Sequence, residues 1–221
     1  MSWFSKLFGK REDAAPSTST RITKIDPRKV LFSIPTIADD LAALEPIDKP
    51  PGRSDVVLSE DDWTQLEFFP RAAQPAIQDQ LTKLKAFETA NRKAVGWKNI
   101  YVRKIERAAV IANASPLKHL ETVLAKPSGG AAFITASNKI AGRIRQGFTF
   151  DLGGNIQLYG YAADNRIPVL AASVGPNADN MKLAAAFMKL NKSDGLMLVD
   201  WRAQLLLVAV SADGNIETWK P

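Results

Sequence analysis

The sequence predicts an α+β protein whose C-terminal strands form a largely antiparallel sheet packed by helices. Short apolar stretches separated by glycine and Asn/Asp turns follow one another through the last third of the chain, which is typical of β-hairpins. One helical pattern, at residues 177–192, interrupts them. The expected order of three strands, one helix and three strands leaves only short connections, and these favour antiparallel pairing.

The C-terminal domain is expected to span residues 127–221. Turn dipeptides such as Gly153-Gly154 and Asp164-Asn165 mark where one strand ends and the next begins. The helix begins near Asn177 with capping Asn/Asp residues and ends at Gly195. The expected strands are residues 148–152, 155–162, 167–174, 196–201, 204–211 and 215–219. The helix face expected to lie across them carries Met181, Ala184, Ala185, Phe187, Met188 and Leu190.

A strand–helix–strand unit with a basic surface is expected over residues 55–126. Residues 63–69 and 97–105 are the expected strands. Between them, residues 75–93 carry apolar side chains every three or four positions, with Pro75 in the first turn and Gly96 as the stop. The next part is less regular. A short helix at 116–125 and a helical second half of 131–145 are expected there.

Residues 1–11 are predicted to be a basic amphipathic docking peptide. Helical spacing gathers the large apolar residues on one side and leaves the basic residues for the other. Burial of the apolar side in a bilayer interface or a partner groove is favourable at about 25 cal/mol per Å². Folding back onto the protein's own body remains the alternative. The peptide consists of Trp3, Phe4, Leu7 and Phe8 with Lys6, Lys10 and Arg11.

Residues 12–54 are expected to be a polar tether followed by a proline-rich arm. The arm has little periodicity, apart from one short helix expected at residues 37–44 and capped near Thr36. No stretch of about 18 apolar residues occurs, and the start of the chain lacks the features of a secretory signal. We therefore expect a cytoplasmic protein that at most attaches to the inner face of a membrane.

The inventory of reactive side chains argues against an enzyme. The 221 residues include no cysteine and one histidine, His119, which excludes thiolate chemistry and any zinc site with two histidines. No nucleophile elbow and no glycine-rich phosphate loop is present. We therefore expect no catalytic residue, no metal site and no cofactor.

Charge is distributed unevenly along the chain. Residues 31–62 carry 2 basic and 8 acidic groups, whereas residues 71–150 carry 14 and 4. The two blocks either neutralise each other on folding or leave a basic surface for an anionic partner. A basic strand with an aromatic residue is the pattern used to bind single-stranded nucleic acid. The candidate surface consists of Lys98, Tyr101, Arg103, Lys104, Arg107, Arg143 and Arg145.

The leading hypothesis is a non-enzymatic protein-interaction protein of the adaptor or toxin-neutralising (immunity) type. Its body is expected to bind another protein, and its N-terminus to dock on an anionic membrane surface or a larger assembly. The first alternative is a nucleic-acid-binding protein that uses residues 97–107. The second is a carboxylate-dependent hydrolase that uses Asp61, Asp62 or Asp151.

Overall fold

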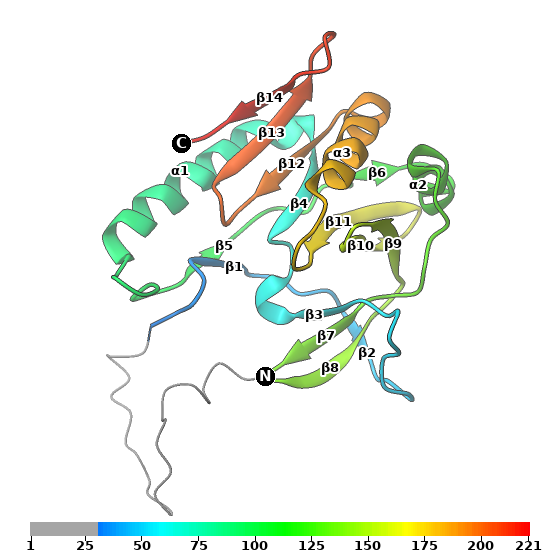
Figure 1. Ribbon diagram of the computed structural model, residues 1–221, viewed down its shortest axis with the longest axis horizontal. Helices are drawn as coiled ribbons and strands as arrows, with labels where there is room; N and C mark the ends of the chain where they lie inside the picture. Colours follow the sequence, from blue (N-terminus) through cyan, green and yellow to red (C-terminus); the bar gives the residue numbers. More distant parts are fainter. Residues whose placement is uncertain (1–30) are drawn as a thin grey trace, which may run out of the picture. The chain divides into compact units, whose positions relative to one another are not determined.

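The computed structural model describes residues 31–221, so the docking peptide predicted at residues 1–11 and the tether after it lie outside the described residues. The described part contains an eight-stranded sheet, a four-stranded sheet and one pair of short parallel strands (Figure 1). All pairings in the large sheet are antiparallel, which confirms the predicted α+β class. No helix within residues 31–221 is long and apolar enough to cross a membrane.

The large sheet contains every strand predicted in the C-terminal third. Left-handed turn residues close its hairpins, as at Asp164 and Asn165, whose φ angles are 49° and 59°. β6 (Ile111–Ala112) also pairs with β11. The other strands, in sheet order, are β14 (Ile216–Trp219), β13 (Leu205–Val210), β12 (Leu196–Asp200), β4 (Leu66–Pro70), β11 (Arg166–Val174), β10 (Ile156–Ala163) and β9 (Gly147–Gly153).

β4 is the unexpected member of this sheet. It follows a 3₁₀ turn at Glu60–Asp62 and lies between β11 and β12, where Glu67 is opposite Ala171 on one side and Val199 on the other. Residues 55–126 and 127–221 therefore share one sheet, and the expected division at residue 126 is not a structural boundary. The alternating pattern around β4 predicted a strand, but an alternating pattern does not identify the partners of a strand.

The small sheet corrects a second expectation. Residues 131–145 were expected to end in a helix, but they form a hairpin of β7 (Phe133–Ala136) and β8 (Lys139–Ile144). Ser137 and Asn138 make its turn, with φ angles of 50° and 63°. β2 (Leu44–Glu45) and β3 (Val57–Ser59) complete this sheet.

The short helix expected at residues 37–44 is also absent. Residues 36–38 form β1 (Thr36–Ala38), which pairs in parallel with β5 (Tyr101–Arg103). β5 is much shorter than the strand expected at residues 97–105. Parallel pairing joins segments that lie far apart in the chain, so local periodicity gives no sign of it.

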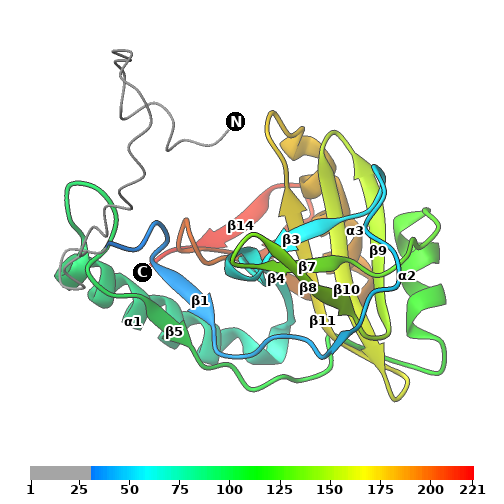
Figure 2. The same ribbon diagram turned by 90° about the horizontal axis from the view of Figure 1, so that it is seen from below.

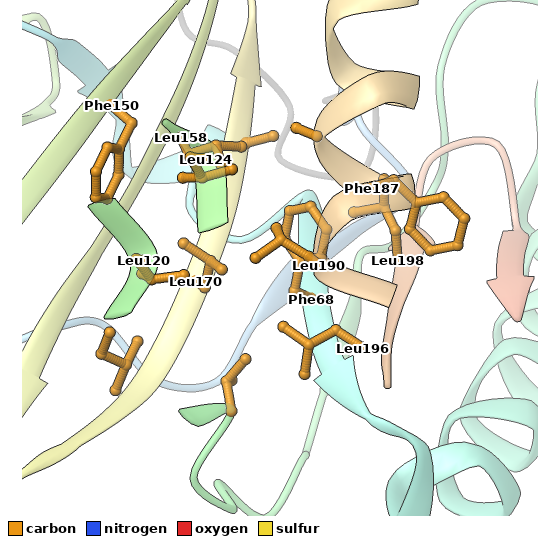
Figure 3. Close-up of a cluster of buried hydrophobic side chains, with 14 of the residues drawn as sticks. Phe68, Leu120, Leu124, Phe150, Leu158, Leu170, Phe187, Leu190, Leu196 and Leu198 are labelled. Carbon is orange, nitrogen blue, oxygen red and sulfur yellow. The ribbon is translucent and has the colours of Figure 1, made fainter. Parts of the chain in front are cut away.

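One face of the large sheet is covered by α2 (Pro116–Leu124) and α3 (Asn180–Asp194), both close to their predicted positions. Phe187 and Leu190 of α3 pack with Phe68 of β4 in an apolar core (Figure 3). The expected α3 face is partly wrong, because the side chain of Met181 is 74% exposed and that of Met188 is 38% exposed.

The opposite face is covered by α1 (Gln74–Asn91) on one part and by the small sheet on another (Figure 2). α1 confirms the helix predicted at residues 75–93. Side chains alternate across β4, so Phe68 belongs to the core under α3, whereas Phe69 belongs to the core under α1. Glu67 lies two residues before Phe69 in the same strand and therefore shares the α1 side of the sheet.

Candidate functional site

The most distinctive surface lies around α1 and β5, which run side by side in Figure 2. The Tyr101 ring lies against the Phe87 ring, with centroids 5.4 Å apart. The Tyr101 hydroxyl donates a hydrogen bond to Gln80 Oε1 at 3.0 Å. β1, which lies far from α1 and β5 in sequence, flanks β5, so these three segments build one side of the molecule. We call this the α1–β5 face.

An exposed cluster of apolar side chains lies at the end of α1 on this face. Phe32 and Trp97 exchange two backbone hydrogen bonds, at 2.8 and 3.0 Å, which bring the start of the described chain beside the loop after α1. We define the apolar patch as Leu31, Phe32 and Val95, whose exposed fractions are 42%, 40% and 72%.

Gly96 fixes the backbone beneath the apolar patch. Its φ of +79° lies in the left-handed region, and a Cβ at this position would overlap the carbonyl oxygen of Phe32. Only glycine therefore allows the two segments to approach so closely. The Arg92 guanidinium stacks on the Trp97 ring, 5.5 Å from its centroid. Val95 therefore lies between two residues with fixed contacts, Arg92 and Gly96.

Arg103 lies beneath this surface and corrects the candidate anionic-partner site. Residue exposure is 1%, and the guanidinium lies 4.9 Å from the Trp201 ring. It donates to Thr36 Oγ1 at 3.2 Å and to the Thr64 carbonyl oxygen at 3.2 Å. Burial lowers the pKa of Arg103 to about 9, so the group stays protonated at neutral pH. Tyr101 and Arg103 do share a face of β5, but it is the inward one, and Val102 faces outward.

Arg107 likewise pairs with carboxylates of the protein itself. Its Nε and Nη2 donate to the two carboxylate oxygens of Asp40 at 2.8 and 2.9 Å, and Nη1 pairs with the fully buried Glu67. Burial alone would raise the pKa of Asp40, but the hydrogen bonds and charge of Arg107 outweigh it and hold that pKa below its usual value. This cluster joins the acidic block of the sequence to its basic block.

The other members of the anionic-partner set lie in separate places. Lys98 and Lys104 are exposed on the α1–β5 face. Arg143 and Arg145 lie on or just after β8, where both approach Glu45, at 3.3 and 4.0 Å. The seven residues therefore do not form one surface. These contacts favour the interpretation in which the two charge blocks neutralise each other.

The carboxylates of the hydrolase alternative are also dispersed. Asp62 pairs with Arg202 at 2.6 Å, and Asp151 accepts a hydrogen bond from the Gly153 amide at 2.8 Å on β9. The amide of Asp61 is capped by the Ser59 hydroxyl. Across residues 31–221, no group of three or more His, Asp and Glu side chains is arranged to hold a metal ion.

His119 does not form a nucleophile–base pair with a serine. Its Nε2 lies 2.7 Å from Asp194 Oδ1, which links α2 to the end of α3. The Ser193 hydroxyl donates to the other oxygen of Asp194 at 2.5 Å. Ser193 and His119 therefore both contact Asp194 and are not hydrogen-bonded to each other. Nucleophilic catalysis needs a hydrogen bond from the serine hydroxyl to the imidazole.

Comparison of the chain with protein-family models, with curated proteins and with solved structures found no match. The apolar patch is therefore identified as a candidate site from its structure alone. Sequence reasoning missed it because Leu31 and Phe32 follow no periodic pattern and Val95 lies in a loop between two predicted elements. A large apolar residue beside a loop glycine was the available signal.

Proposed function

We propose that this chain is a non-enzymatic protein-interaction protein, of the adaptor or immunity type, that binds its partner through the apolar patch. The observation that carries the proposal is the patch itself, with three large apolar side chains at least 40% exposed on a backbone fixed by Gly96. Exposed apolar groups that lie together are typical of interaction sites. Complete burial of a Val, Leu or Phe side chain contributes about 1.5–3 kcal/mol, so a partner that covers several gains substantial affinity.

The test is the substitution Val95→Asp in the full chain. Val95 is 72% exposed, so the change places a charge in the patch without disturbing the core. We expect capture of the partner from cells to fall at least about tenfold. The matched control is Val174→Asp, because Val174 is also exposed, at 40%, but lies at the end of β11. Equal capture by the wild type and both variants would contradict the proposal.

We further propose that residues 1–11 dock the protein on an anionic membrane surface or on a larger assembly. The proposal rests on sequence alone, through the Trp3/Phe4/Leu7/Phe8 cluster and its basic neighbours. Deletion of residues 1–11 is expected to abolish sedimentation with anionic liposomes and to leave partner capture through the patch intact. Liposome sedimentation that is identical with and without these residues would refute membrane docking.

A further inference from the structure

Residues 104–109 continue from β5 as an extended chain that has no strand partner. Their exposure alternates, with Lys104, Glu106 and Ala108 exposed and the three residues between and after them half-buried. Within residues 31–221, no backbone N–H or C=O of this segment hydrogen-bonds to another residue. Pairing resumes at Val110, whose amide donates to the Ile167 carbonyl oxygen at 2.8 Å. A free row of backbone donors and acceptors is a template for another strand.

A cavity of about 340 Å³ lies between this segment and the first half of α1. This volume falls in the range of about 300–1,000 Å³ that is typical of ligand pockets. The alanines on the α1 side leave room for a larger side chain from outside. Asp79, Lys104 and Glu106 supply charges, whereas Arg107, also in the lining, is paired with Asp40 and Glu67. We call this cavity the α1 groove. Its apolar lining consists of Pro70, Ala72, Ala73, Ala76, Ile77, Ile105 and Ala108.

We infer that the α1 groove binds an extended segment of the partner protein, which pairs with residues 104–109 as an added β-strand. The inference rests on the proposed function and names the chemistry of the bound segment. Strand addition supplies the missing backbone hydrogen bonds, while a pocket beside the strand selects one side chain. Ile105, together with Ala76 of α1 and Ala72 and Ala73 of the 3₁₀ turn before it, makes that pocket suitable for an aliphatic residue.

Charge complementarity sets the order of residues in the bound segment. Lys104 and Glu106 are two positions apart, so they face the same side of the extended chain. Opposite charges directly across a strand pair are stabilising. An antiparallel segment that reads basic–aliphatic–acidic places its basic residue against Glu106 and its acidic residue against Lys104. α1 forms the other wall of the groove, so the space beside residues 104–109 admits a single extended segment.

The test uses two blocked peptides of equal composition, Thr-Val-Thr-Arg-Val-Glu and Thr-Val-Thr-Glu-Val-Arg, added to the full chain. The first is expected to slow hydrogen exchange of the 104–109 amides and to bind about tenfold more tightly than the second. A version N-methylated at alternate amides should lose this protection, because it cannot complete the strand. If neither peptide alters exchange or chemical shifts at residues 104–109, the inference is wrong.

Two pairs of variants separate the groove from general effects. Ala76→Phe fills the groove and should weaken the first peptide at least about tenfold, whereas Ala86→Phe, also exposed on α1 but outside the groove, should not. Exchange of the charges in Lys104→Glu/Glu106→Lys should reverse the preference between the two peptides. If the peptides fail while Val95→Asp still abolishes partner capture, the groove inference falls and the proposed function stands. If the peptides bind while Val95→Asp leaves capture unchanged, the groove binds a strand and the apolar patch is not the partner site.

Discussion

The two faces of the large sheet are stabilised by different means. Under α2 and α3 the core is apolar throughout, from Phe68 of β4 to Leu190 of α3. On the α1 side, apolar cores alternate with a buried polar cluster that contains Arg103 and Glu67. The apolar face is held mainly by packing of apolar side chains, whereas the polar cluster holds β1 and residues 104–109 in place beside an exposed surface. The two faces therefore differ in the kind of side chain that holds them together.

The largest effect is expected on the apolar face. Phe187→Ala removes a fully buried ring and should lower the free energy of unfolding by about 3–5 kcal/mol, through lost burial and the cavity left behind. Urea unfolding measures the loss. Met181→Ala on the same helix is the control and should stay within about 0.5 kcal/mol, because Met181 is 74% exposed. A loss below about 1 kcal/mol for Phe187→Ala would remove the contrast between the faces.

The second-largest loss of stability is expected on the polar face. Arg103→Ala leaves Thr36 Oγ1 and the Thr64 carbonyl oxygen without their donor, which should cost about 3 kcal/mol in urea unfolding. Lys104→Ala, one residue on and exposed, should cost almost nothing. Equal costs for the two substitutions would mean that the buried cluster does not stabilise β1 against β5.

A smaller effect is expected at the apolar patch. Gly96→Ala combines positive-φ strain with an overlap on the Phe32 carbonyl oxygen, for a cost of about 2 kcal/mol. Gly214→Ala shares a positive φ, at +83°, but its Cβ would meet nothing within 4 Å, so only the strain of about 1 kcal/mol remains. Hydrogen exchange at the Phe32 and Trp97 amides should accelerate only in Gly96→Ala. Unchanged exchange there would show that the loop tolerates a side chain.

The smallest effect is electrostatic. The folded-state pKa of Asp40 lies below its ordinary value of 3.8, so the unfolded chain takes up the proton first as pH falls. The Asp40–Arg107 pair therefore contributes its full stability above about pH 4, and this contribution disappears as pH falls through the lowered pKa. Because the Asp40 side chain is 39% exposed, we expect no more than about 1 kcal/mol. Asp40→Asn should make the midpoint of urea unfolding fall less steeply as the pH is lowered below about 4. An unchanged pH dependence in this variant would show that the pair does not contribute to stability.

The elements that sequence predicted well are those with a strong local signal. α1 has its apolar period and Pro75, and the C-terminal hairpins have turn residues that tolerate positive φ. The failures are non-local. The pairing of β1 with β5 and the insertion of β4 depend on partners more than 60 positions away, which no local pattern encodes.

The candidate site was less predictable than the fold, for a similar reason. Alternation placed Tyr101 and Arg103 on one face of a strand, but it could not say that this face is buried. The depth of Arg103 is set by Trp201 and Thr64, which come from other parts of the chain. The backbone of residues 104–109 is unpaired because no other strand within residues 31–221 lies beside it. A sequence pattern does not show which strands lie side by side.

The position of β4 also determines when the large sheet can be completed during synthesis. Of the two neighbours of β4, β11 begins at Arg166 and β12 only at Leu196, whereas β4 itself ends at Pro70. Without β4, the hairpin of β12 and β13 has no bond to the strands from β9 to β11. During synthesis, Phe68 and Phe69 therefore remain without their sheet partners until β12, which ends at Asp200, has left the ribosome. Closing this sheet is a late, long-range step, and topologies of that kind fold slowly.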